Sequence, residues 1–165
     1  MAVITIGNTA SDRANIEGLS YTKIDKNNPA NETGTITSVD IYAQADIANC
    51  KIGVFTLISG SSFTCRSATA DLGTVTAGIH NYTVSLSVVT GDYLGIYGSS
   101  FNGKVETDQS GAGLWYKSGD QTSCVNTAFS SLIPNRTMSI GGTGTTPITT
   151  LVKDPIQAGI IAFPR

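Results

Sequence analysis

The chain has 165 residues, of which 40% are hydrophobic and 13% are charged, and its formal net charge is −2. This length suits one domain with a hydrophobic core of its own. The chain has ten basic and twelve acidic residues, and the basic residues form no dense cluster, which argues against a nucleic-acid partner. No apolar run approaches the roughly 18–20 residues that a membrane-spanning helix needs, so we expect no membrane partner.

Alternation of apolar and polar residues predicts short strands in the first half of the chain. Residues 19–24 and 36–41 predict two such strands, separated by a loop that contains the turn Asn27-Asn28-Pro29. Residues 50–58 and 63–67 flank Ser59-Gly60-Ser61, a connection of the length that makes a hairpin. A further short strand is expected at residues 72–76.

The second half of the chain continues the same pattern. Tyr82, Val84, Leu86 and Val88 alternate with Thr83, Ser85 and Ser87, so residues 82–88 predict a strand with one buried and one solvated face. Residues 93–97 predict a central strand, with Gly95 closely approached by another backbone. More short strands are expected at residues 104–107, 114–117, 127–130 and 138–140. About ten strands at roughly 8–12-residue spacing, without a helical pattern, predict an all-β fold: an antiparallel β-sandwich or jelly roll.

The C-terminal region differs in composition. The glycine-rich run 141–147 predicts a linker, which divides the chain into a sandwich domain (1–142) and an extended C-terminal arm (143–165). The arm is too short to form a core of its own. It either folds back as edge strands or crosses to a neighbouring subunit by strand addition, through Ile148, Leu151, Val152, Ile156, Ile160, Ile161 and Phe163.

Catalytic chemistry has little support in the sequence. His80 is the only histidine, so a Ser-His-Asp or Cys-His arrangement would have to use it, and we expect it in a solvent-facing loop. Glu106 and Asp108 share one strand face, as sugar-cleaving sandwiches require, but a solvated strand end explains them more simply. Asp92, Asp108 and Asp120 would allow a calcium ion, although turn-forming aspartates are far more common. We therefore expect no enzyme activity, no metal and no cofactor.

The aromatic pair Trp115-Tyr116 is the best candidate for ligand binding. Adjacent residues of a strand point to opposite faces, so we expect Trp115 to be buried and Tyr116 to be available to a glycan or a protein partner. Asp120, in a following turn, would supply a polar contact from a loop. These three residues form the predicted ligand site.

The three cysteines do not fit a zinc site, because none of them form a CxxC-like pair. Cys50 alternates in phase with Ile52 and Val54, which places it on an apolar strand face. Cys65 and Cys124 are therefore the candidates for a disulfide, which would form in an oxidising setting.

Several segments together resemble a little-characterised family of β-sandwich domains from phage and environmental sequences, distantly similar to concanavalin-A-like lectins. They are Phe63-Thr64-Cys65-Arg66, residues 89–97, Gly113-Leu114-Trp115-Tyr116, Gly119-Asp120-Gln121 with Cys124, and residues 139–144. The resemblance covers roughly residues 18–144 and implies a virion-associated or surface-displayed module without a catalytic residue. Cys65 and Cys124 both lie within the shared segments.

These observations favour a non-enzymatic structural subunit of a phage-like particle or another extracellular assembly, such as a capsid decoration or fibre protein. It would form homo-oligomers through its sandwich faces and the C-terminal arm, and would contact other virion or assembly proteins. A carbohydrate-binding, lectin-like module is the alternative, with glycans as partners.

Overall fold

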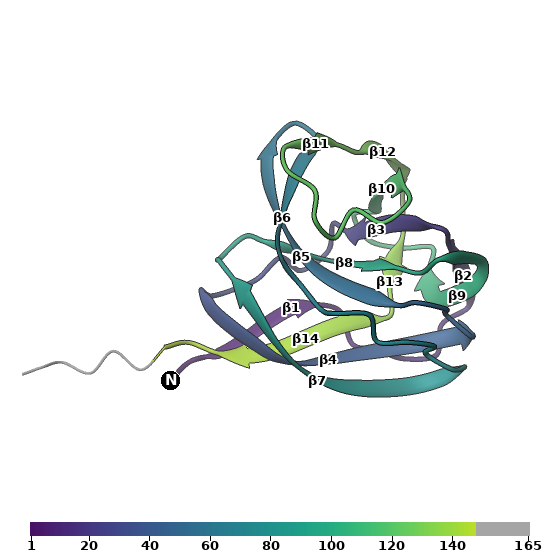
Figure 1. Cartoon of the computed structure of the whole chain (residues 1–165), viewed down its shortest axis with the longest axis horizontal. Coiled ribbons are helices and arrows are strands. Elements are labelled where there is room, and N and C mark those ends of the chain that lie inside the picture. The colour runs from purple at the N-terminus through teal and green to yellow at the C-terminus, as the bar shows by residue number, and fades with distance from the viewer. Residues whose placement is uncertain (148–165) are drawn as a thin grey trace, which may run out of the picture.

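The structure is a computed structural model, which describes residues 1–147 except for the side chains of Ser131 and Leu132. Within these residues it contains no helix, and hence none that could cross a membrane. Two antiparallel sheets of seven strands each pack face to face (Figure 1). The predicted all-β sandwich is therefore confirmed.

The first sheet, sheet A, is built around the long strand β4. On one side β4 pairs with β7, and on the other side it pairs with β14 and then with β9. β1 borders β14, while β2 and β13 pair with β9. The strands of sheet A are β1 (Val3–Gly7), β2 (Asn15–Leu19), β4 (Gly34–Ala45), β7 (Gly78–Val88), β9 (Ser100–Asp108), β13 (Thr137–Met138) and β14 (Ile140–Thr145).

The second sheet, sheet B, has the order β11-β6-β5-β8-β3-β10-β12. Its strands are β3 (Tyr21–Asp25), β5 (Lys51–Ser59), β6 (Ser62–Ala68), β8 (Tyr93–Tyr97), β10 (Leu114–Ser118), β11 (Thr127–Ala128) and β12 (Ser130–Ile133). The predicted hairpin of residues 50–58 and 63–67 is confirmed as β5 and β6. The expected strand at residues 72–76 is reduced to a single bridge between Ile47 and Val75.

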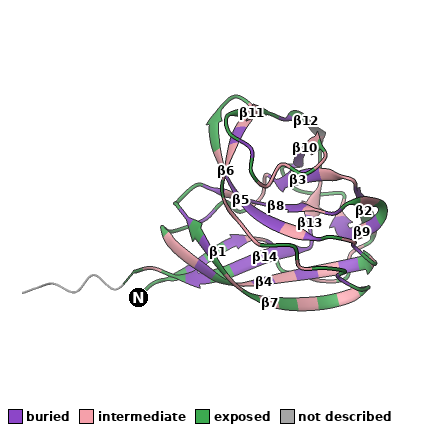
Figure 2. Cartoon of the chain, in the orientation of Figure 1, coloured by how far each residue is buried: buried purple, intermediate pink, exposed green. Residues whose placement is uncertain are grey.

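The core between the sheets is mainly aliphatic. Side chains from both inner faces meet there, and Figure 2 shows how buried residues concentrate between the sheets. The predicted faces of residues 82–88 are confirmed in β7: Leu86 and Val88 are buried, while Tyr82 and Val84 pack against the core from its margin. Gly95 is approached by the backbone carbonyl of Lys23, as its position in a central strand predicts.

The glycine-rich segment after residue 140 is a strand, so the prediction of a linker there was wrong. β14 lies between β1 and β4 and pairs with both. A Cβ atom at Gly141 or Gly144 would overlap a carbonyl oxygen, that of Asn8 or of Thr35. Glycine is present here because neighbouring backbones approach closely. The sandwich therefore extends through Thr145. The predicted arm residues from Ile148 to Phe163 lie outside the described residues.

Candidate functional site

The acidic pair Glu106 and Asp108 lies on the outer face of sheet A, where the chain before β2 covers it. Arg13 forms an ion pair with Asp108, and its backbone N–H donates to Glu106 Oε2 at 3.3 Å. Arg13 Nε also donates to Ser139 Oγ at 2.6 Å. Glu106 is 4% exposed, and burial raises its pKa above the usual value. The two carboxylates thus hold the Arg13 segment against sheet A, and neither stands free for a substrate.

The other predicted polar residues are also engaged locally. Asp92 is buried and pairs with Arg66 Nε at 2.5 Å, and Asp120 pairs with Lys51 Nζ at 2.7 Å. His80 lies on β7 rather than in a loop, with its Nε2 2.8 Å from the Thr76 carbonyl oxygen. Among residues 1–147, no three His, Cys, Asp or Glu side chains come together as a metal-binding group.

Trp115 belongs to an aromatic cluster on the outer face of sheet B. It is 9% exposed and makes edge contacts with Phe63 and Tyr93, at ring-centroid distances of 4.8 and 5.1 Å. The ammonium group of Lys26 lies 4.6 Å from the Trp115 ring centroid. These neighbours occupy the indole, so Trp115 serves packing and offers little surface to a sugar ring.

This aromatic cluster is sealed by the chain between β10 and β12, which we call the covering segment (residues 119–129). Phe129 and Cys124 of this segment are buried in the cluster together with Ile24, Phe55 and Phe63. Backbone bonds fix the segment at both ends: the Thr22 N–H donates to the Gly119 carbonyl at 3.1 Å, and the Phe129 N–H donates to the Ser61 carbonyl at 2.9 Å. The outer face of sheet B thus carries a second core.

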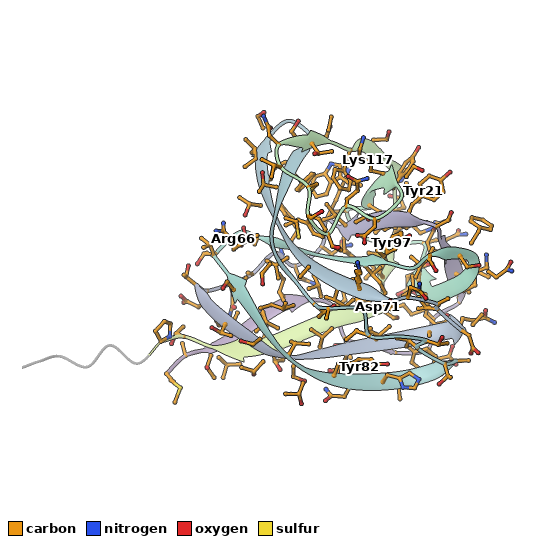
Figure 3. All side chains as sticks on the ribbon, in the orientation of Figure 1. Tyr21, Arg66, Asp71, Tyr82, Tyr97 and Lys117 are labelled. Carbon is orange, nitrogen blue, oxygen red and sulfur yellow. The ribbon has the colours of Figure 1, made fainter. Side chains whose placement is uncertain are left out.

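Tyr116 points to the opposite face of β10 and is half-buried. Its ring meets that of Tyr21, labelled in Figure 3, in an edge contact at 5.9 Å. Tyr116 retains exposed surface that Trp115 lacks. The predicted trio therefore separates: Trp115 is in the second core, Tyr116 is on the other side of the sheet, and Asp120 is tied to Lys51.

The candidate disulfide residues lie opposite one another. The Cys65 N–H donates to the Cys124 carbonyl at 2.9 Å, and both side chains contact the aromatic cluster. Both thiols are free in this structure, and burial raises the pKa of Cys65 to about 12. Cys50 is buried in the core between the sheets, where burial raises its pKa to about 12 as well.

The edges of the two sheets are a feature that the sequence predictions missed. Most of them are short or covered. β11 has two residues, β12 has four, and β2 has five and carries Glu17, which is paired with Lys23 and Arg136. The free side of β1 is covered by residues 28–31, from which Asn31 Oδ1 accepts the Thr5 N–H at 2.8 Å. The Asn31 N–H donates to the Thr5 carbonyl at 3.2 Å, and the Gly7 N–H donates to the Asn28 carbonyl at 2.8 Å.

β7 is the exception among these edges. It has eleven residues, and in the part of the chain that the structure describes it pairs only with β4. It forms one border of the molecule in Figure 1. Its sequence, GIHNYTVSLSV, contains no Lys, Arg, Asp, Glu or Pro. Charges and prolines are residues that normally protect an edge strand, and β7 has neither, so its free side presents backbone donors and acceptors; its register with β4 shifts once, between Ile36 and Ser38.

A groove of about 290 Å³ runs beside this edge. One wall is β7 from Thr83 to Leu86, and the other wall is residues 68–70 with Leu72. The local signal that could have indicated this site is the absence of charge and proline across an eleven-residue strand. The lack of a neighbouring strand could not be read from the local sequence.

Comparison with known proteins gives no match: no protein family, no curated protein and no solved structure is significantly similar to this chain. The resemblance to phage sandwich domains therefore stays a prediction.

Proposed function

We propose that this protein is a non-enzymatic structural subunit that assembles with copies of itself in a phage-like particle or another extracellular assembly. The observation that carries the proposal is the bare edge of β7, an eleven-residue strand without charge or proline. An extended chain that meets such an edge gains backbone hydrogen bonds along its whole length.

The contrast with the other edges supports a functional explanation. The same chain covers β1 with hydrogen bonds from residues 28–31 and ends sheet B in very short strands. A long edge left open beside them is an aggregation hazard unless a partner occupies it. The expected virion or extracellular location rests on the resemblance of the sequence segments, and it is part of the proposal.

Sedimentation velocity of the full chain over a range of concentrations tests this function. We expect species heavier than a monomer at micromolar concentration. Because β7 carries no charged side chain, we also expect added salt to leave the assembly largely intact, since salt screens charge pairs rather than backbone bonds. A chain that remains monomeric at every concentration would contradict the proposal.

Carbohydrate binding is a second candidate, and the half-buried Tyr21–Tyr116 pair favours it. A glycan array with Tyr116→Ala tests it, with Tyr97→Ala as the matched control on β8. Saturable binding that Tyr116→Ala abolishes and Tyr97→Ala retains is expected of a lectin-like site. Equal binding by both variants would exclude the tyrosine pair as that site.

A further inference from the structure

The edge of β7 and the apolar C-terminal segment fit each other. Resting on the proposed self-assembly, we infer that residues 156–163 of one copy add as a strand to β7 of a second copy, with apolar side chains in the adjacent groove. The partner of the open edge is then the C-terminal segment of another molecule of the same chain.

The groove has the chemistry that an apolar strand requires. Val84 and Leu86 of β7 and Leu72 of the opposite wall line it, and all three contact the core between the sheets. Ala68 and Ala70 belong to the same wall, and their small side chains leave space in the groove. The remaining lining residues are uncharged. Filling the groove would remove apolar surface from water at roughly 25 cal/mol per Å².

Residues 156–163 have a matching pattern, IQAGIIAF. In an extended strand, alternate side chains share one face, so Ile156, Ala158, Ile160 and Ala162 would line up together. This face is wholly apolar. The segment includes no proline between Ile156 and Phe163, so no backbone donor is missing, and every second residue there can donate a hydrogen bond to β7.

The end of β14 is held by the residues that precede β1. The Thr146 N–H donates to the Ala2 carbonyl at 3.1 Å, and the Ala2 N–H donates to Thr146 Oγ1 at 2.9 Å. Pro147 favours extended geometry at Thr146. The next turn signal in the sequence is Asp154-Pro155.

The chain is long enough to reach either its own β7 or that of a second copy. Thr145 at the end of β14 pairs with Thr35 of β4, which pairs with Ser87 of β7, so this end of β7 lies two strand spacings, roughly 10 Å, away. The eight residues 156–163 span roughly 26 Å when extended, which covers much of β7. The choice of a second copy therefore rests on the proposed self-assembly, and the number of subunits tests it.

This contact is heterologous, because it joins two different surfaces of the same chain. It generates rings or open chains of more than two subunits. Pairing of β7 with β7 of a second copy would instead close at a two-fold dimer. The number of subunits therefore distinguishes the two modes of assembly.

Sedimentation velocity on four variants of the chain tests the inference. One ends at Pro147, Val84→Lys and Ala70→Lys each add a charge to a wall of the groove, and Thr37→Lys adds the same charge to the exposed face of β4 as the control. We expect the full chain and Thr37→Lys to form assemblies larger than dimers. The truncated chain and both groove variants should shift to monomers. Ala70 is exposed, so Ala70→Lys keeps the test decisive if Val84→Lys fails to fold.

The alternative results separate this inference from the proposed function. Assemblies that survive truncation, or that are lost on truncation but survive both groove charges, would overturn the inference and leave self-assembly standing. A full chain that is monomeric throughout would overturn both. A monomeric full chain whose melting temperature falls on truncation would show that the segment binds its own sandwich.

Discussion

The strands β1 and β7 form opposite sides of sheet A, and the chain treats them differently. β1 is five residues long, and residues 28–31 satisfy its free backbone groups with hydrogen bonds to Thr5 and Gly7. β7 is more than twice as long and receives no comparable cover from residues 1–147. Since both strands belong to one sheet, the difference lies in what the rest of the chain supplies. The proposed function assigns β7 as the side where a partner adds.

The same contrast extends to the outer faces of the sheets. The covering segment and the aromatic cluster seal the outer face of sheet B. On sheet A, the outer face of β7 exposes Asn81, Thr83, Ser85 and Ser87. A sealed face contributes to the stability of the fold, and under the proposed function the open face and edge contribute mainly to contacts between molecules. The predictions below test this division.

The largest effect on stability is expected from replacing a buried side chain on the sealed outer face of sheet B. Phe63→Ala removes a fully buried ring that contacts Trp115, Tyr93 and Phe129, and it should lower the free energy of unfolding by about 3–5 kcal/mol. Thr83→Ala on the exposed face of β7 should change it by less than about 0.5 kcal/mol. Urea denaturation of both variants measures the difference. Equal losses would show that the two sides do not differ in this way.

The next largest effect is expected from oxidation of Cys65 and Cys124. The hydrogen bond from the Cys65 N–H to the Cys124 carbonyl holds the two residues side by side, and a disulfide needs Cα atoms about 4.4–6.8 Å apart. A thiol–disulfide oxidant such as glutathione disulfide would take up the two electrons and two protons released, and the bond should add about 2–4 kcal/mol by closing a long loop. The high pKa of Cys65 makes the reaction slow at neutral pH, because little thiolate is present.

Peptide mapping of the oxidised protein checks this pairing, and denaturation with and without reductant checks its effect on stability. Cys65→Ser and Cys50→Ser form a matched pair of variants. The first should abolish the gain in stability, and the second should preserve it. A bond that includes Cys50 would contradict the assignment.

A smaller effect is expected from uncovering β1. Asn31→Ala removes the side-chain acceptor of the Thr5 N–H and should cost about 1 kcal/mol. The Thr5 amide should then exchange with solvent faster in an NMR experiment. Asn81→Ala is the control, because the Asn81 side-chain amide donates to the side chains of Ser38 and Asp40, away from β1. Unchanged exchange at Thr5 would mean that Asn31 does not protect this edge.

The smallest effect concerns the part of the outer face of sheet A that the Arg13 segment covers. Burial raises the pKa of Glu106, so the folded protein takes up a proton at higher pH than the unfolded chain. This contribution to stability is fully present below the unfolded pKa of about 4.3 and is lost as the pH rises through the folded pKa. Glu106→Gln should remove it and so flatten the difference in stability between acidic and neutral pH. A variant with an unchanged pH profile would contradict the burial of this carboxyl.

The sequence predicts the fold well where one face of a strand is apolar and the other is polar. β7 is of this kind, because its alternation is long and uninterrupted. The β5–β6 hairpin does not alternate in this way, and its signal was the turn Ser59-Gly60-Ser61. β14 was missed because glycines look like a linker, although here they allow three backbones to lie close together. β1 was missed because five residues, with only Ile4 and Ile6 buried, give a weak signal.

The candidate site could be predicted only in part, for a topological reason. The absence of charge and proline in residues 78–88 is visible in the sequence, but the lack of a neighbouring strand depends on where β4 and β14 lie. In the same way, the burial of Trp115 depends on Phe63, which is distant in the sequence, and on Phe129 of the covering segment. Local alternation predicts which face of a strand a side chain lies on, but not which other segment covers that face.

Hydrogen exchange read by mass spectrometry, at low and at high protein concentration, tests the central claim most directly. We expect the amides of β7 (Gly78–Val88) to exchange more slowly as the full chain assembles, while those of β1 (Val3–Gly7) keep one rate. Assembly that slows exchange in β1 or in sheet B and leaves β7 unchanged would contradict the claim that β7 is the edge to which a partner adds.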